Sequence, residues 1–199
     1  AVLSPLLSNI YLNPLDWLMV EQGKEMVRYA DDAVILCRSE KEAHEALEKV
    51  QQWVTESGLT LHPQKTRIVD ASQPGGFDFL GYHFERGKKW PRKKSMARLK
   101  EAIRMRTRRN NGKSMKAICA SLNLVLRGWY GYFKHSPRHV FSAVDSFVRG
   151  RLRSILRRRQ HRKGFGNNLK CHQRWPNAYF FAMGLLSLKE AHRAKCQSS

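Results

Sequence analysis

Met-Val-Arg-Tyr-Ala-Asp-Asp-Ala-Val-Ile-Leu, residues 26–36, places two adjacent carboxylates, Asp31 and Asp32, between two short apolar runs. This pattern predicts two short buried strands joined by a turn at the acidic pair. Ionised carboxylates beside apolar surface must be paired, protonated or bound to a metal. Both acids at the tip of a hairpin would suit Mg²⁺, which prefers oxygen ligands and assists phosphoryl transfer. The plainer interpretation is a polar turn, in which Asp is common.

Charge is distributed very unevenly along the 199 residues. Residues 1–84 carry 7 Lys and Arg against 12 Asp and Glu, whereas residues 85–199 carry 30 against 4. So many cations repel one another unless a polyanion neutralises them. Nucleic acid is the expected partner, because Lys and Arg that bind phosphates release condensed counterions. An anionic lipid surface fits less well, since the cations are interleaved with apolar core positions and form no terminal polybasic anchor.

Several classes of protein are disfavoured by composition. No apolar run of about 18 residues occurs, so we expect no transmembrane helix and no membrane partner. The chain begins Ala1-Val2-Leu3, with neither a basic signal-peptide segment nor an initial Met, which is typical of a fragment. The four cysteines form no C-x₂-C pair, so a zinc module is unsupported, although Cys171, His172 and Cys196 remain alternative metal ligands.

The acidic half predicts a mostly antiparallel sheet with packed helices. One helix is expected to begin with Ser4 as its N-cap and Pro5 in its first turn, and Pro14 is expected to interrupt it. A second helix follows the hairpin, with a capping box formed by Ser39 and Glu42, and it ends at Gly58. Short strands are expected at residues 59–61, 66–69 and 77–84.

The basic half predicts a small bundle of three amphipathic helices, beginning at Ser95, Ser114 and Ser136. The aromatic cluster at residues 128–133 is expected between the last two helices. It could stack on RNA bases or form core, and we expect Trp129 and Phe133 to be mostly buried. A mobile basic loop is expected at residues 157–164. The fold class is therefore α+β, with expected segments 1–84, 85–94 as a linker, 95–165 and 166–199.

These motifs, in this order, resemble the C-terminal part of bacterial group II intron reverse transcriptases with maturase activity. The resemblance implies a partial polymerase palm followed by a basic helical thumb, or maturase-specific domain X. It also implies a mobile-element nucleotidyltransferase that copies intron RNA into DNA, aids RNA splicing and works in the bacterial cytoplasm near the nucleoid. The matching blocks are residues 4–12, 28–32, 58–61 with 65–66, 79–82, 128–133, 172–178 and 184–185.

The resemblance also implies roles near the acidic hairpin. Asp31 matches a metal-ligand aspartate and Asp32 the neighbouring carboxylate, with Mg²⁺ as cofactor. Tyr29 would lie near the growing 3′ end of a DNA primer. Lys65 matches a lysine that approaches the incoming dNTP and protonates the pyrophosphate, although a solvated loop lysine fits its sequence equally well.

Three further residues match contacts to the primer and template. Ser4 and Pro5 match a region that touches the RNA template, although helix capping alone would explain them. Gly81 matches the segment that grips the primer, where a glycine permits close backbone approach. Intron RNA is expected to contact cations of the basic half, namely Arg104, Arg108, Arg109, Lys113, Arg157, Arg158, Arg159, Arg162 and Lys163.

One departure from the family pattern limits the expected activity. The family's palm supplies another metal-binding aspartate upstream of the Ser4-Pro5 block, and neither Asp16 nor Asp78 fits it. Because two-metal chemistry needs ligands for both ions, we expect this chain alone not to polymerise. The alternative is an RNA-binding maturase relic without catalysis. A retron-type polymerase would share the hairpin but not the blocks at residues 128–133 and 172–177.

Overall fold

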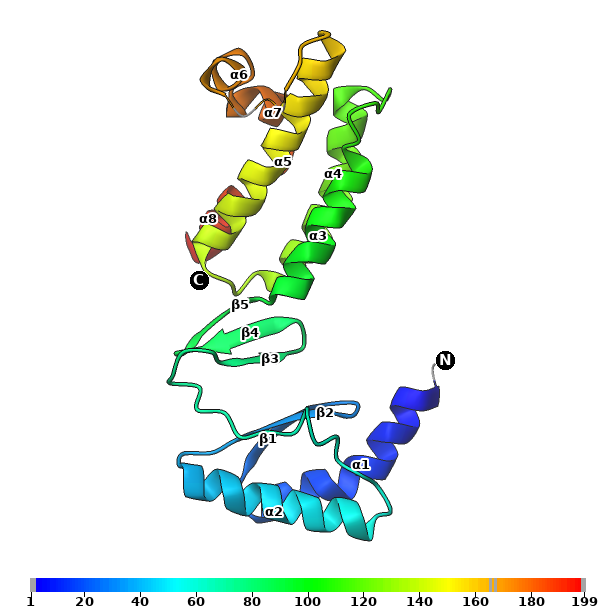
Figure 1. Ribbon diagram of the computed structural model, residues 1–199, viewed down its shortest axis with the longest axis vertical. Coiled ribbons are helices and arrows are strands. Elements are labelled where there is room, and N and C mark those ends of the chain that lie inside the picture. The colour runs from blue at the N-terminus through cyan, green and yellow to red at the C-terminus, as the bar shows by residue number, and fades with distance from the viewer. Residues whose placement is uncertain (1–2, 165, 167, 198–199) are drawn as a thin grey trace. The chain divides into compact units, whose positions relative to one another are not determined.

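The computed structural model describes residues 3–164, 166 and 168–197, and the chain divides into two compact units, Ala1–Phe79 and Leu80–Ser199. Figure 1 shows the elements of each unit. The first contains α1 (Leu3–Glu21), β1 (Glu25–Tyr29), β2 (Asp32–Leu36), α2 (Glu40–Glu56) and β3 (Phe77–Phe79). The second contains β4 (Tyr82–Glu85), β5 (Lys88–Pro91), α3 (Lys93–Arg106), α4 (Met115–Phe133), α5 (Arg138–Arg159), α6 (Leu169–Arg174), α7 (Asn177–Ala182) and α8 (Leu188–Gln197). The predicted α+β class is confirmed.

The first unit is built on the predicted hairpin. β1 and β2 pair antiparallel, with Tyr29 opposite Asp32 and a two-residue loop between them. α1 contacts β1, α2 contacts β2, and the two helices contact each other. The strands were predicted to be buried, which is wrong: Val27 is 46% and Leu36 49% exposed. The helices pack against this small sheet, and alternate side chains of a strand point to opposite faces.

Local capping explains the limits of α2. The Ser39 hydroxyl accepts a hydrogen bond from the Glu42 N–H at 3.2 Å, as predicted. The Glu42 carboxylate accepts from the Arg38 N–H at 2.7 Å and pairs with Lys24, and the Lys24 bond is the main cause that lowers the pKa of Glu42. At the other end Gly58 has φ +70°, the left-handed conformation that commonly ends a helix.

α1 differs from its prediction at two prolines. The helix already includes Leu3, so Ser4 and Pro5 lie within its first turn and Ser4 is not the N-cap. Pro14 does not interrupt the helix, which continues to Glu21. A proline inside a helix removes one backbone donor. Burial of Leu15 and Met19 stabilises the turns that follow it.

The predicted strands after α2 need correction. Residues 59–61 and 66–69 form no strand, and no neighbouring strand is available there to pair with them. Residues 77–84 form β3 and the start of β4 instead of one strand. Leu80 and Gly81 between them have φ +45° and +82°, and a turn with two positive φ angles ends an extended run.

The second unit has one continuous hydrophobic core between its long helices. Ile103 of α3, Leu122 and Leu126 of α4, and Phe141 and Leu152 of α5 are all fully buried in it. The Ser114 hydroxyl accepts from the Ala117 N–H at 3.2 Å and caps α4 as predicted. α3 begins at Lys93, two residues before the predicted Ser95, and α5 begins at Arg138.

Two stretches of the second unit are more helical than predicted. The aromatic residues 128–133 lie inside α4, because its apolar stripe continues to Phe133. Phe133 is buried and Trp129 is partly buried against the core, as expected. Arg157, Arg158 and Arg159 form the last turn of α5 and not a loop. The basic loop begins only after them.

The C-terminal elements are fastened to α5 by buried polar groups. Arg153 donates to the Trp175 carbonyl and to Asn177 Oδ1, each at 3.0 Å, and burial lowers its pKa. Asp145 accepts from the Ser187 hydroxyl at 2.7 Å and from the Leu188 N–H at 2.9 Å, which fixes the start of α8. These bonds hold the junction between α6 and α7 and the start of α8 against α5.

The domain limits remain predictions. Residues 85–94 contain the end of β4, all of β5 and the start of α3, and the predicted limit at residue 165 lies outside the described residues. Among the described helices, none is long and apolar enough to cross a membrane.

Candidate functional site

The acidic turn presents both carboxylates to solvent. Asp31 lies in the two-residue loop and Asp32 begins β2, and both are exposed. Neither carboxylate forms a hydrogen bond or an ion pair with any residue that the structure describes. Tyr29 is 67% exposed and lies opposite Asp32 in the sheet register. Residues paired across two strands point to the same face, so Tyr29 and Asp32 share one surface.

Arg28 holds the turn from inside the unit. Its guanidinium forms a two-pronged ion pair with Asp16 of α1, with Nε 2.7 Å from Oδ1. Its Nη1 also donates to Asn9 Oδ1 at 3.0 Å and to the Ala30 carbonyl at 2.8 Å. The hydrogen bonds that Arg28 donates to Asp16 are the main cause that raises the pKa of Arg28. Ala30 has φ +54°, which is uncommon without glycine. The hydrogen bonds of Arg28 therefore hold a strained turn next to the two acids.

The donor chemistry of this turn fits a hard divalent cation. Asp31 and Asp32 supply carboxylate oxygens that no described protein group occupies, and a small cation such as Mg²⁺ is usually held by one or two carboxylates. Among the described residues, no group of three or more His, Cys, Asp or Glu is placed to hold a metal. The two acids thus form a partial ligand set.

The predicted catalytic Lys65 and the predicted template contacts Ser4 and Pro5 form no hydrogen bond or ion pair with the two acids in the part of the chain that the structure describes. Lys65 is exposed in a turn, where its N–H donates to the His62 carbonyl at 3.1 Å, and its amine contacts neither Asp31 nor Asp32. Ser4 and Pro5 are exposed in α1.

The turn at Gly81 is held by hydrogen bonds from other residues of the second unit. The Gly81 carbonyl accepts from the Ser95 hydroxyl at 2.9 Å and from the Arg92 N–H at 3.0 Å. The Tyr132 hydroxyl donates to the Leu80 carbonyl at 2.6 Å, and the Tyr82 hydroxyl donates to the Tyr132 carbonyl at 2.6 Å. Burial, followed by the neighbouring Tyr132, raises the pKa of Tyr82. The aromatic cluster thus fixes a backbone turn.

The predicted RNA-binding cations divide into two groups. Three of them donate to backbone carbonyls: Arg157 to that of Lys163, Arg159 to those of Asn111 and Lys113, and Arg109 to that of Gly164 at 3.0 Å. The bonds of Arg109 and Arg159 tie the loop after α3 to the end of α5 and the loop that follows it, and the bond of Arg157 holds that second loop against α5. Arg104 pairs with Glu101 at 3.3 Å and lies over the Phe147 ring.

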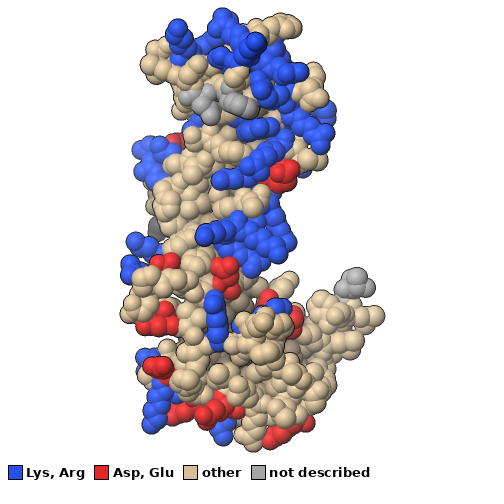
Figure 2. Space-filling model, viewed as in Figure 1, with Lys and Arg blue, Asp and Glu red and all other residues tan. Residues whose placement is uncertain are grey.

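The second group faces solvent. It contains Arg108, Lys113, Arg158, Arg162 and Lys163, all of them exposed. Figure 2 shows Lys and Arg spread over much of the visible face of the second unit, with few acidic residues among them. A hollow of about 500 Å³ lies between the two tied loops and is lined by Arg109, Arg158, His161, Arg162, Lys163 and Gly164.

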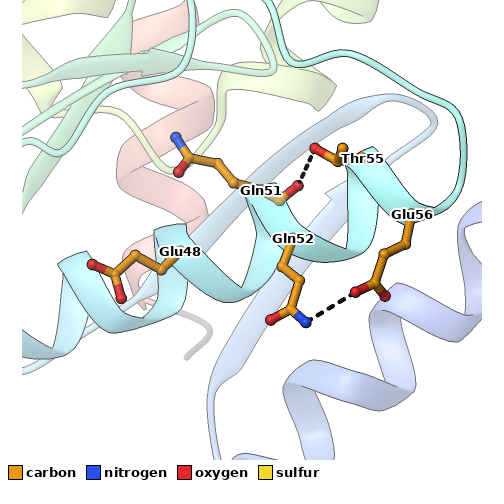
Figure 3. Close-up of a pocket in the computed structure, with 5 residues that line it drawn as sticks. All are labelled: Glu48, Gln51, Gln52, Thr55 and Glu56. Carbon is orange, nitrogen blue, oxygen red and sulfur yellow. Dashed lines mark hydrogen bonds between the residues drawn. The ribbon is translucent and has the colours of Figure 1, made fainter.

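A second hollow, of about 420 Å³, lies on α2 and has different chemistry. Figure 3 shows its lining, all from neighbouring turns of one helix: Glu48, Gln51, Gln52, Thr55 and Glu56. Gln52 donates to Glu56 at 2.9 Å and the Thr55 hydroxyl donates to the Gln51 carbonyl at 2.8 Å. No second element contributes a converging group, so this surface is a solvated helix face.

Sequence reasoning missed the residues that hold these sites. The partners of Arg28 lie 12 and 19 positions away, and those of Tyr132 and Arg159 lie about 50 away. Arg28 directly precedes the Tyr29-Ala30-Asp31-Asp32 segment, which was the one available signal for its role.

The comparisons with known proteins agree with this division of the chain. Residues 1–84 match the family described as reverse transcriptase (RNA-dependent DNA polymerase). Residues 96–175 match the group II intron, maturase-specific domain. No curated protein matches the chain at a significant level. The two family matches stand in the order in which the acidic hairpin and the basic helical unit follow each other. The chain therefore joins a reverse-transcriptase segment to a group II intron maturase-specific domain, which is the domain combination of an intron-encoded reverse transcriptase and maturase.

Proposed function

We propose that Asp31 and Asp32 supply part of the metal site of an RNA-directed DNA polymerase, and that the basic unit binds intron RNA. The observation that carries the proposal is the pair of exposed, unpartnered carboxylates on a turn that Arg28 braces. A bound Mg²⁺ would activate the primer 3′-hydroxyl and offset charge on the leaving pyrophosphate.

The remaining residues of the hairpin would orient the substrates. Tyr29 shares a face with Asp32 and would contact the primer end, and Lys65 would bring a positive charge to the incoming triphosphate. Ser4 and Pro5 would approach the template, and the braced Gly81 turn would contact the primer strand. RNA template, DNA primer and dNTP are the implied partners, and a cytoplasmic location in a bacterium is part of the proposal.

We further propose that this chain alone does not extend a primer, because two-metal catalysis needs more carboxylate ligands than Asp31 and Asp32 provide. The test is primer extension with the full chain, Mg²⁺ and an RNA template, and we expect no incorporation of dNTP. Robust incorporation would refute this part of the proposal.

Metal binding tests the role of the acidic turn independently of catalysis. We expect the full chain to bind Mn²⁺, followed by electron paramagnetic resonance, and Asp31→Asn with Asp32→Asn to weaken that binding strongly. The control is Glu45→Gln with Glu48→Gln, which removes two exposed acids of α2. Equal losses in both double variants would show that the turn is not a specific site.

A further inference from the structure

The hollow between the loops after α3 and α5 has lining groups that share one sign of charge. Arg109, Arg158, Arg162 and Lys163 are cationic, and no carboxylate is among the described residues that line the hollow. The side chains of Arg158, Arg162 and Lys163 form no hydrogen bond or ion pair with the described residues. Like charges gathered in a concave surface raise the local positive potential and attract an anion. The hollow is therefore unfavourable for an apolar partner and favourable for phosphate.

The walls of this hollow are fixed by the protein. Arg159 bonds to two carbonyls of the loop after α3, while Arg157 and Arg109 bond to carbonyls of the loop after α5. Arg109 and Arg159 thus hold the two loop regions together, and Arg157 holds the loop after α5 against the end of its own helix. Because the framework is already set, binding an anion there costs less ordering of the chain.

His161 occupies a position at the end of α5 that is usually held by glycine. α5 ends with the Arg162 N–H bonded to the Arg157 carbonyl and the His161 N–H bonded to the Arg158 carbonyl. In this type of helix end the residue at the position of His161 is most often glycine, because its φ is positive. His161 has φ +54° and lines the hollow. A side chain kept in a strained backbone position points to a functional role.

We propose that this hollow is a phosphate-binding site for RNA. Its binding residues are Arg158, His161, Arg162 and Lys163, and the hydrogen bonds of Arg109, Arg157 and Arg159 hold its walls in place. This inference rests on the proposed RNA binding of the basic unit and assigns a particular site to it. The volume of about 500 Å³ lies within the range of clefts that hold nucleotide-sized ligands, so it suits a piece of backbone better than a lone ion.

The first experiment compares two matched double variants of the full chain in RNA binding as a function of salt. Arg158→Gln with Arg162→Gln should weaken binding about tenfold or more and flatten the salt slope by about 1.4 for a single strand. The control, Arg98→Gln with Arg127→Gln, removes two exposed helix arginines that do not line the hollow. Equal losses of RNA affinity in both double variants would refute the proposed phosphate-binding site, but they would not contradict the proposed RNA binding of the basic unit. If the parent chain bound no RNA, both proposals would fail.

The second experiment separates binding from folding. His161→Gly should raise the thermal midpoint, because glycine adopts the positive φ without strain, and it should weaken RNA binding, because the imidazole is lost. A purely structural histidine would raise the midpoint and leave RNA affinity unchanged, which would overturn its assignment.

The source of the phosphate is resolved with two oligonucleotides of the same sequence. The chain could bind 5′-hydroxyl and 5′-phosphorylated RNA equally well, with both affinities weakened by Arg158→Gln with Arg162→Gln. This result would show that the site binds internal phosphodiesters. A preference for the 5′-phosphate that this double variant abolishes would assign it to a terminal phosphate. If Arg158→Gln with Arg162→Gln left the affinity for both RNAs unchanged, the proposed phosphate-binding site would be refuted.

Discussion

The guanidinium of Arg28 joins α1, β1 and the acidic turn through four hydrogen bonds. Its side chain is 10% exposed and that of Asp16 is 34% exposed, so the ion pair is only partly shielded from water. A planar guanidinium can bond both carboxylate oxygens and a backbone carbonyl at once, which an ammonium group cannot do with the same geometry. The position of the two candidate metal ligands therefore depends on an arginine that bonds to α1 and to the Ala30 carbonyl and to neither acid of the turn.

Arg28→Lys tests the role of these hydrogen bonds. The substitution keeps the positive charge but removes the planar guanidinium that bonds both carboxylate oxygens. We expect the first unit to lose about 1–3 kcal/mol of stability. Mn²⁺ binding at Asp31 and Asp32 should weaken as well, because Ala30 is no longer held. Chemical denaturation and Mn²⁺ titration measure the two effects. Arg38→Lys is the control, since the Arg38 side chain forms no hydrogen bond with the residues that the structure describes. Similar losses in the two variants would contradict the proposed role of Arg28.

Two tight turns of the second unit show how an element can be held either locally or from outside. Arg86 and Gly87 join β4 to β5 with φ +50° and +69°, and a Cβ added at Gly87 would meet nothing within 4 Å. Gly81 has φ +82°, and an added Cβ would lie 3.3 Å from the Ser95 hydroxyl that bonds its own carbonyl. The first turn is determined by its sequence alone, whereas the second is fitted to α3 and α4.

Gly87→Ala and Gly81→Ala form a matched pair. The first should cost about 1–2 kcal/mol, the penalty for an L-residue in the left-handed region. The second should cost more, because Ser95 must also move and its bond to Gly81 weakens. Denaturant unfolding measures both losses. A smaller loss for Gly81→Ala than for Gly87→Ala would show that the contact with Ser95 does not hold the turn.

The two units of the whole molecule differ in how much apolar surface they bury. Among the described residues of the first unit, only Leu15, Met19, Ala46 and Val54 are buried apolar side chains. The second unit has a continuous core that reaches from α3 to α8. Apolar burial is the main favourable contribution to folding, so the second unit is the more stable one. Large apolar side chains of α1 remain exposed instead, namely Leu3, Leu6, Leu7, Ile10, Tyr11, Trp17 and Val20.

Hydrogen exchange of the full chain checks this difference. Amides of α4 and the middle of α5 should exchange slowest, and those of β1, β2 and α2 should exchange by a lower-energy opening. Equal protection in the two units would contradict the inferred difference in stability. The measurement also shows whether unfolding occurs in one step or two.

The sequence by itself determined the local features: the hairpin with its acidic pair, the caps at Ser39, Gly58 and Ser114, and the basic character of residues 85–199. These depend on neighbouring residues, on helical periodicity and on charge, all of which can be counted along the chain. The failed expectations, such as the strands at residues 59–61 and 66–69, needed a partner that the chain order does not reveal. Only the tertiary structure placed Asp16 against Arg28, Tyr132 against Leu80, and Arg159 against Asn111. Such contacts join residues 12 to 52 positions apart, and which distant groups meet is decided by packing.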